Sequence, residues 1–266
     1  MQKSIFVWIT WTLMACGATE APLERTLVWG DEFDYTGAPD PEKWDYDLGD
    51  GCPRICGWGN NELEYYTREP ENVRVENGSL IIEAHQGEKG GKAYTSARIV
   101  SRGKAAWKYG RVEVRAKIPG GLGTWAAIWM MPEDNHYGHW PKSGEIDIME
   151  HVGYAPDQVL GTVHTEAYNG MIGTQVGDTI FDASAEQDFH VYTLDWTHNR
   201  IVVSMNDQPY FTFSQKPGAD YKAWPFNQPF HLIMNLAVGG NWGGRHGVAD
   251  DIWPRRMEVD YVRVYQ

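Results

Sequence analysis

Apolar and polar residues alternate one by one in many short runs of this chain. The clearest run covers residues 111–118 (RVEVRAKI), in which every second side chain is apolar. Successive side chains of a β-strand point to opposite faces, so this pattern predicts a strand with one buried face. Comparable runs predict further strands over residues 79–84, 191–196, 200–205, 208–213, 230–237 and 261–265.

Turn-forming residues separate these runs, and no long segment shows the helical period. The chain contains 29 Gly and 14 Pro, and Asn206-Asp207 lies between two predicted strands as a two-residue hairpin turn. This pattern favours an all-β fold, a sandwich of two antiparallel sheets. One domain accounts for the length, because all-β domains of about 200–250 residues are common. We place this domain at residues 26–266.

The N-terminus has the features of a bacterial secretion signal, which we place at residues 1–15. Its apolar run is shorter than the roughly 20 residues that cross a bilayer as a helix. The run ends in Leu-Met-Ala-Cys, which is similar to a bacterial lipobox with Cys16 as the lipidated residue. An ordinary signal cleaved near Ala18 or Ala21 is the alternative. Residues 16–25 then form a short tether, and we expect an outer-membrane lipoprotein, a periplasmic protein or an extracellular one.

The overall charge limits the possible partners. A net charge of -13 at pH 7 argues against nucleic acid and against anionic membrane surfaces, both of which attract basic proteins. Any membrane contact is therefore expected only through a lipid at Cys16. Cys52 and Cys56 then remain as an even pair, which in a secreted protein predicts a disulfide. A metal site is the weaker alternative, because the chain has no second cysteine pair and no His close to this one.

Three carboxylates follow one another closely at Glu145, Asp147 and Glu150. On a strand, Glu145 and Asp147 share one face, while the two Ile residues beside Asp147 share the other. Glu150 has the wrong offset for the first face unless a β-bulge near Met149 restores it, and bulges are frequent beside active sites. Acids that converge on one face suit a retaining glycosidase, which uses one carboxylate as nucleophile and another as proton donor. The simpler alternative is a half-buried strand with a solvated acidic face.

Tryptophan residues lie close to this acidic segment. The chain has 13 Trp, and Trp125, Trp129 and Trp140 all lie just upstream of the acids. Indole faces stack on the apolar faces of pyranose rings, so Trp beside carboxylates predicts a groove for carbohydrate. For Trp125 and Trp129 the alternative is packing in the core.

With these residues the chain resembles glycoside hydrolase family 16, and within it the laminarinase-like endo-β-1,3-glucanases. The acids match the bulged form of the family motif, Glu-x-Asp-x-x-Glu. Further matching segments are WGDEF (29–33), GWGNNELEYYT (57–67), GTVHT (161–165), NLAVGGNW (235–242) and EVDYVRVY (258–265). The resemblance runs from about Leu27 to the C-terminus and implies a β-jelly roll with a concave substrate groove.

This resemblance implies a retaining endo-hydrolase that cleaves laminarin-like β-1,3-glucans by double displacement. It assigns Glu145 as the nucleophile, Glu150 as the general acid/base, and Asp147 as a residue that assists the nucleophile. A mixed-linkage β-1,3(4)-glucanase, or another polysaccharide hydrolase of the family, is the alternative. A non-catalytic β-glucan-binding protein on the same fold is disfavoured because all three acids are present.

The resemblance also implies residues outside the acid cluster. The expected substrate-binding residues are Asn60, Arg98, Trp125, Trp129, His164 and Trp242. His151 directly follows Glu150 and should face the other way, so it is expected to be structural or to support the acids from behind. A calcium ion would bind carboxylate and carbonyl oxygens on the convex face, at Glu32, Gly78 and Asp260, and would stabilise the fold; two surface acids without a metal are the alternative. We expect no cofactor for catalysis, and a monomer whose partner is a β-glucan polysaccharide.

Overall fold

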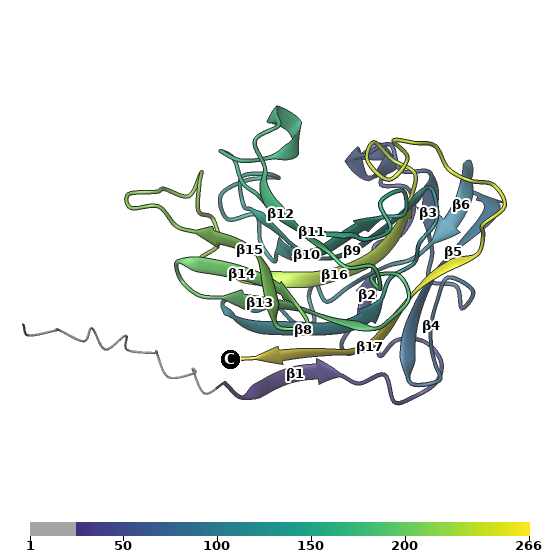
Figure 1. The fold of residues 1–266 in the computed structure, drawn as a ribbon, viewed down its shortest axis with the longest axis horizontal. Helices are drawn as coiled ribbons and strands as arrows, with labels where there is room; N and C mark the ends of the chain where they lie inside the picture. Colours follow the sequence, from purple (N-terminus) through teal and green to yellow (C-terminus); the bar gives the residue numbers. More distant parts are fainter. Residues whose placement is uncertain (1–24) are drawn as a thin grey trace, which may run out of the picture.

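A computed structural model describes residues 25–266, whose regular backbone is almost entirely β-strand. In this part of the chain seventeen strands and two short 3₁₀ segments follow one another (Figure 1). The strands are β1 (Leu27–Asp31), β2 (Asp45–Tyr46), β3 (Glu64–Tyr66), β4 (Val73–Glu76), β5 (Ser79–Lys89), β6 (Lys92–Ser96), β7 (Arg98–Val100), β8 (Gly110–Lys117), β9 (Thr124–Pro132), β10 (Glu145–Val152), β11 (Gln158–His164), β12 (Val176–Phe181), β13 (His190–Trp196), β14 (Arg200–Met205), β15 (Gln208–Ser214), β16 (Phe230–Val238) and β17 (Arg255–Tyr265). The 3₁₀ segments are η1 (Cys56–Gly59) and η2 (Gly170–Ile172). The predicted signal segment and Cys16 lie outside the described residues.

The strands form two sheets that pack face to face as a jelly-roll sandwich (Figure 1). The larger sheet has ten strands in the order β15-β14-β13-β8-β17-β5-β6-β3, with β1 paired to β17 and β4 to β5. The smaller sheet has seven strands in the order β12-β11-β10-β9-β16-β7-β2. The predicted sandwich of two antiparallel sheets is confirmed, with one exception: the pair β3 and β6 runs parallel. Parallel neighbours need a long connection, and here β4 and β5 provide it.

The strands follow the alternation in the sequence. In β8 the side chains of Val112, Val114 and Ala116 are buried, while the residues between them are half-buried. The predicted hairpin turn is confirmed. Asn206 and Asp207 have φ values of 50° and 61°, the left-handed values that a tight two-residue turn between β14 and β15 requires.

The core lies between the two sheets and holds the smaller sheet in place. Side chains from both inner faces are fully buried, among them Val114 and Tyr192 of the larger sheet and Ile128 of the smaller one. Burying one such apolar side chain contributes about 1.5–3 kcal/mol. All nine residues of β16 are buried, and β16 pairs with β9 in the middle of the smaller sheet. The strands beside it therefore have a fixed register, as a site built on them requires.

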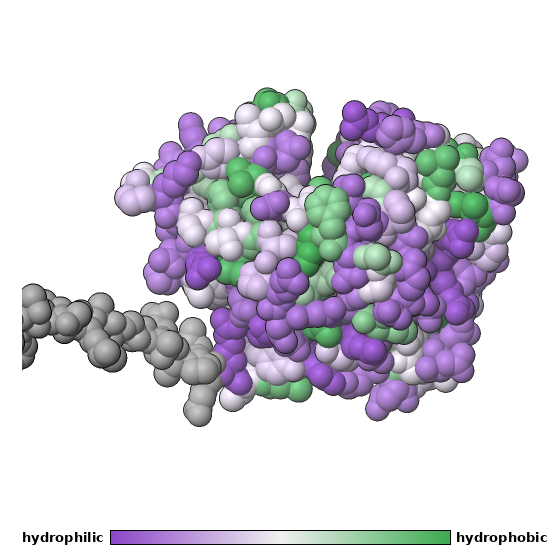
Figure 2. Space-filling model, viewed as in Figure 1, coloured by the Kyte–Doolittle hydropathy of each residue, from purple (hydrophilic) through white to green (hydrophobic). Residues whose placement is uncertain are grey.

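The surface is hollowed over the smaller sheet. Figure 2 shows a notch between two raised lobes, and in the same view of Figure 1 the strands β9, β10 and β11 lie below it. The segment with η2 rises on one side of the notch, and the segments with η1 and β3 rise on the other. Within residues 25–266, no helix is long and apolar enough to cross a membrane.

Candidate active site

The acidic strand β10 contains the β-bulge that the spacing of the acids predicted. Opposite β9, Asp147 pairs with Trp129 and Met149 pairs with Ile128, so Ile148 is an extra residue. The pairing of β10 with β11 also shifts by one residue, between Asp147 and Glu150. The bulge returns Glu150 to the face of Glu145 and Asp147, so three carboxyls lie on one face of the sheet.

Glu150 is held in a site that favours its protonated form. Burial raises the pKa of Glu150 to about 7, and the nearby charge of Glu145 adds to this, although His164 and a hydrogen bond from Trp125 oppose it. That bond runs from Trp125 Nε1 to Glu150 Oε1 at 3.2 Å. A carboxyl with this pKa can both donate and accept a proton near neutral pH.

Glu145 lies at the more open end of the cluster. Its side chain is 16% exposed, and Oε2 accepts a hydrogen bond from Trp140 Nε1 at 2.5 Å. Trp140 is a contact that we did not assign to the site. Its position five residues before Glu145, in a segment rich in Trp, was the available signal.

Asp147 and His164 face each other between the two glutamates. Asp147 is 2% exposed, and burial together with the charges of Glu145 and Glu150 raises its pKa well above the usual range. His164 Nε2 lies 3.4 Å from Asp147 Oδ2 and 3.9 Å from Glu145 Oε1. His164 therefore links the middle of the acid cluster to β11.

The hydrogen bonds of His164 determine which nitrogen can donate. The backbone N–H of Gly170 donates to Nδ1 at 3.2 Å, which leaves the hydrogen of the neutral ring on Nε2. Burial lowers the pKa of His164, but the hydrogen bond to Asp147 and the three nearby carboxyls outweigh it and raise the pKa to about 10. The Gly170 amide opposes a second proton on Nδ1. In both protonation states Nε2 carries a hydrogen, and it lies 3.4 Å from Asp147 Oδ2.

Glu145, Asp147 and His164 also form the one group of three or more acids, histidines or cysteines in residues 25–266 that could hold a metal ion. The ligand atoms of Glu145, Asp147 and His164 all lie within 4.8 Å of one another. A metal would need the lone pair of His164 Nε2, yet that nitrogen carries a hydrogen, because Gly170 occupies the lone pair on Nδ1. The cluster is therefore arranged as an acid group paired with His164.

Tryptophan side chains lie beside the acids. Trp125 is half-buried and packs edge-to-face on Trp242, with ring centroids 5.4 Å apart. Trp129 is also half-buried, and its Nε1 donates to Asn235 Oδ1 at 2.8 Å. Both Nε1 groups thus bond to polar side chains, so these residues are not simply packed in the core. Their partly exposed rings can stack on sugar.

Arg98 and Asn60 lie on the η1 side of this surface. The Arg98 guanidinium carbon is 4.6 Å from the ring centre of Trp58 and 4.7 Å from that of Trp129. Its Nε is 3.1 Å from Asp47 Oδ2, which fixes the head group between the two rings. We did not assign Trp58 or Asp47, although Trp58 belongs to the matching segment 57–67. Asn60 Nδ2 donates to Glu62 Oε1 at 3.1 Å.

His151 faces away from the acids, as expected. Its ring is completely buried, with Nδ1 2.7 Å from the Gln158 carbonyl and Nε2 3.0 Å from Glu186 Oε1. These contacts tie β10 to the core side of the fold. His151 is a structural residue.

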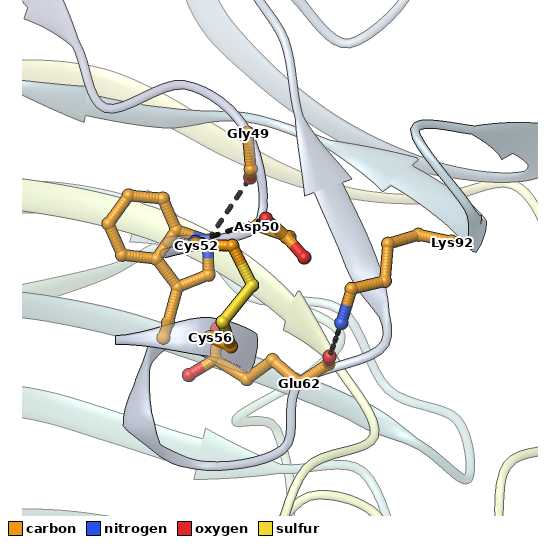
Figure 3. The surroundings of a disulfide bond; sticks show 7 residues. Gly49, Asp50, Cys52, Cys56, Glu62 and Lys92 are labelled. Atoms are coloured by element: carbon orange, nitrogen blue, oxygen red, sulfur yellow. Dashed lines mark hydrogen bonds between the residues drawn. A yellow bond between two sulfur atoms is a disulfide. The ribbon is translucent and has the colours of Figure 1, made fainter. Parts of the chain in front are cut away.

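A disulfide joins Cys52 and Cys56 in the loop that leads to η1. Figure 3 shows it beside Glu62, whose backbone carbonyl accepts a hydrogen bond from Lys92 Nζ at 2.7 Å. The pair therefore lies where it can hold the loop before Asn60.

The two carboxylates expected to bind calcium are engaged by other side chains in this structure. Glu32, Gly78 and Asp260 all lie near the point where β17 stops pairing with β5, at Val259, and starts pairing with β1, at Val262. We call this point the junction. Both carboxylates, however, are ion-paired with arginine. Glu32 accepts two bonds of 2.8 Å from Arg263, and Asp260 accepts one of 2.6 Å from Arg115. A calcium ion would have to displace these partners. Gly78 lies in the turn between β4 and β5.

A hollowed β-sheet that carries converging carboxyls beside partly exposed tryptophans defines a glycoside hydrolase of the jelly-roll class. Comparison with known proteins agrees with this class. The family model of glycosyl hydrolases family 16 matches residues 60–263. The chain is 57% identical over 247 residues to a beta-glucanase of Rhodothermus marinus, covering 90% of this chain and 85% of the relative.

Solved structures show the same relationship. The fold matches the X-ray structure of the laminarinase from Rhodothermus marinus with a TM-score of 0.88 and 55% identity, over 91% of this chain and 98% of that one. It matches SCLam, described as a non-specific endo-β-1,3(4)-glucanase from family GH16, with a TM-score of 0.87 and 47% identity over 92% of each chain. The protein belongs to glycoside hydrolase family 16.

Proposed function

We propose that this protein is a retaining endo-β-1,3-glucanase that cleaves laminarin-like glucans. The observation that carries the proposal is the bulged strand β10, with Glu145 and Glu150 on one face and with Glu150 buried enough to hold a proton near neutral pH. The named activities of the Rhodothermus marinus relatives support β-glucan as the substrate class.

Two displacements account for the reaction. In the first, the Glu145 carboxylate attacks the anomeric carbon while Glu150 gives its proton to the glycosidic oxygen, and the bond between that carbon and oxygen breaks. In the second, Glu150 takes a proton from a water molecule that attacks the same carbon, which frees Glu145 and restores the proton on Glu150. Burial raises the pKa of Asp147 well above its usual range, which opposes a further negative charge beside the nucleophile.

The test is the release of reducing ends from laminarin, barley mixed-linkage glucan, carboxymethyl cellulose and agarose in parallel. Cleavage of laminarin to a ladder of short oligosaccharides supports an endo-β-1,3-glucanase. A first product of retained anomeric configuration, seen by NMR, supports double displacement. Glu145→Gln should abolish hydrolysis and leave glucan binding in place. A fully active Glu145→Gln variant, or no cleavage of laminarin by the wild type, would refute the proposal.

A mixed-linkage β-1,3(4)-glucanase is the second candidate. It is favoured by the similarity to SCLam, whose description names both linkages. Barley glucan cleaved as fast as laminarin would select it. A non-catalytic glucan-binding role is disfavoured, since all three carboxyls are present and Glu150 can carry a proton.

We further propose export across the inner membrane of a bacterium, with residues 1–15 as the signal and a lipid on Cys16 at the start of a tether that ends at residue 25. The catalytic domain would then be residues 26–266, acting as a monomer at the outer membrane, in the periplasm or outside the cell. Mass spectrometry of the N-terminal peptide tests this, because a diacylglycerol on Cys16 supports it and an unmodified cleaved N-terminus refutes the anchor.

We also propose calcium as a structural ion at the junction of Glu32, Gly78 and Asp260, in competition with the arginines. The mixture of carboxylate and carbonyl oxygens suits calcium. Binding there requires Arg263 to release Glu32. No catalytic step depends on it.

A further inference from the structure

Two buried carboxyls, Glu62 and Glu64, lie between η1 and β3, and the proposed chemistry uses neither of them. Glu64 is completely buried and Glu62 is 5% exposed. Glu62 forms a bridge to Gly239, and Glu64 Oε2 accepts a hydrogen bond of 2.7 Å from the Val238 N–H. Both acids therefore lie against the end of β16, just before the loop that carries Trp242.

Glu62 is the ionised member of this pair, because both of its side-chain oxygens accept hydrogen bonds. Oε1 accepts from the Asn60 amide at 3.1 Å, and Oε2 accepts from the Tyr66 hydroxyl at 3.2 Å. The Tyr66 oxygen itself accepts from Asn235 Nδ2 at 3.1 Å, so its one hydrogen is left for Glu62. Asn235 is oriented in turn by the donor Trp129 Nε1. Asn60 and Tyr66 therefore donate to Glu62, and the bonds from Trp129 and Asn235 lead to it through Tyr66.

Glu64 has one oxygen without a donor. Its Oε1 is buried, and no N–H or O–H group of another residue donates to it. Among the described residues, the nearby cations are committed elsewhere, since Arg98 is paired with Asp47 and Lys92 bonds to the backbone carbonyl of Glu62. An ionised Oε1 would leave a bare charge beside a second carboxylate, which is costly in a buried site, whereas a proton on Oε1 makes it a donor. Burial, the charge of Glu62 and a hydrogen bond with Glu62 raise the pKa of Glu64 well above its usual range.

We propose that Glu62 and Glu64 share one proton, carried by Glu64 and donated to Glu62, and that this acid pair positions the substrate side of the groove. The second half of the proposal rests on the β-glucanase function proposed above. Glu64 holds the Glu62 carboxylate in place. Glu62 then orients Asn60 directly, and it orients Trp129 through a chain of three hydrogen bonds that passes through Tyr66 and Asn235. Glu62 and Glu64 are positioning residues, since neither needs to touch the substrate.

The first test follows stability against pH and needs no substrate. Unfolded Glu64 loses its proton near pH 4.3, as an ordinary Glu does, so above that pH the folded state binds one more proton and its stability falls as pH rises. Gln donates the same hydrogen bond and cannot ionise. The melting temperature of Glu64→Gln minus that of the wild type should therefore rise by about 3–5 °C per pH unit, up to the folded pKa of Glu64.

Exposed Glu88 supplies the matched control for this measurement. Glu88→Gln should show no such trend. If the melting temperature of Glu64→Gln minus that of the wild type does not change with pH, the shared proton is overturned. Infrared difference spectra give a second reading, because subtraction of Glu64→Gln from the wild type at neutral pH should leave the C=O band of a neutral carboxylic acid. An ionised carboxylate band in its place would also overturn the proposal.

The second test uses laminarin kinetics. Tyr66→Phe removes only the hydroxyl that joins Glu62 to Asn235, and it should raise KM about 2- to 10-fold with kcat within about twofold, because one lost hydrogen bond weakens ground-state and transition-state binding alike. Glu64→Ala should raise KM in the same way, and Glu64→Gln should restore it. An unchanged KM for Tyr66→Phe, or a Glu64→Gln enzyme as impaired as Glu64→Ala, would overturn the positioning role.

These outcomes separate the two proposals. A wild type that does not cleave laminarin refutes the β-glucanase function, while the pH trend in melting still decides whether the acids share a proton. A wild type that cleaves laminarin without that trend refutes the acid pair alone.

Discussion

Replacing Trp125 by Phe should shift the alkaline limb of the pH–activity profile to higher pH. Glu150 must be protonated to act as the general acid, so kcat/KM falls as pH rises through its pKa of about 7. Burial raises this pKa, and the hydrogen bond from Trp125 Nε1 to Glu150 Oε1 opposes the increase because it stabilises the ionised carboxylate. Phe keeps an aromatic face and loses the donor.

The size of the shift follows from the one hydrogen bond that is lost. A bond of this kind contributes a net 0.5–1.5 kcal/mol or so, and one pKa unit corresponds to about 1.36 kcal/mol, so the limb should move up by about 0.4–1 pH unit. The pKa of Glu150 depends on the charges around it, so the limb reports an apparent value for the site as a whole. We therefore compare the profiles of the wild type and Trp125→Phe, measured as kcat/KM on laminarin across the neutral and alkaline range. The influence of the neighbouring charges is common to both profiles and cancels in the difference.

Trp129→Phe is the matched control. It makes the same change of ring in the same strand, but its Nε1 bonds to Asn235 and not to an acid of the cluster. Both variants lose stacking area and should lower kcat/KM at every pH, whereas only Trp125→Phe should move the limb. A limb that stays fixed or moves to lower pH in Trp125→Phe, or that moves equally in both, would refute the role of Trp125 in setting the proton affinity of Glu150.

Three further predictions concern single contacts. Trp140→Phe removes the donor to Glu145 Oε2 and should lower kcat/KM on laminarin about 2- to 10-fold with an unchanged melting temperature; full activity would count against Trp140 as a catalytic contact. Arg263→Ala frees Glu32 from its ion pair. When calcium is added in excess after treatment with EDTA, it should raise the melting temperature of this variant more than that of the wild type. Equal increases would contradict competition between calcium and Arg263. Replacing both Cys52 and Cys56 by Ser opens a short loop and should lower the melting temperature by about 4–8 °C at most in a calorimetric scan, and no decrease would show that the bond does not stabilise the loop.

The strands were predictable because each carries its own signal. In β8, burial alternates with the sequence, so the residues specify their own face without knowledge of the partner strand. The turn at Asn206 and Asp207 is equally local, since both residues tolerate the left-handed backbone that it needs. Strand β3 has only three residues, too few for a pattern, and its parallel partner β6 lies beyond two intervening strands. The parallel pair was therefore not predictable.

Contacts that depend on distant side chains were also missed. Tyr66 and Asn235 are 169 positions apart, and only the folded β3 and β16 bring the hydroxyl to the amide. The same is true of Glu32, whose partner Arg263 is 231 positions away on β17. Matching the family motif assigned Glu32 to calcium because a motif records residue types and their order. It does not record that an arginine on the neighbouring strand takes both oxygens.

The acid cluster was predictable because the apolar residues beside the carboxyls occupy the core face of β10, so the carboxyls must lie on the opposite face. Ile148 and Met149 are both completely buried, so two successive apolar side chains of β10 point to the core. A regular strand cannot bury both, and one extra residue at a bulge resolves the conflict. Without the bulge Glu150 would point into the core, on the side where His151 is now bonded to Glu186. Burying that carboxylate unpaired would be costly, so the apolar pair between Asp147 and Glu150 determines that the third acid faces the substrate groove.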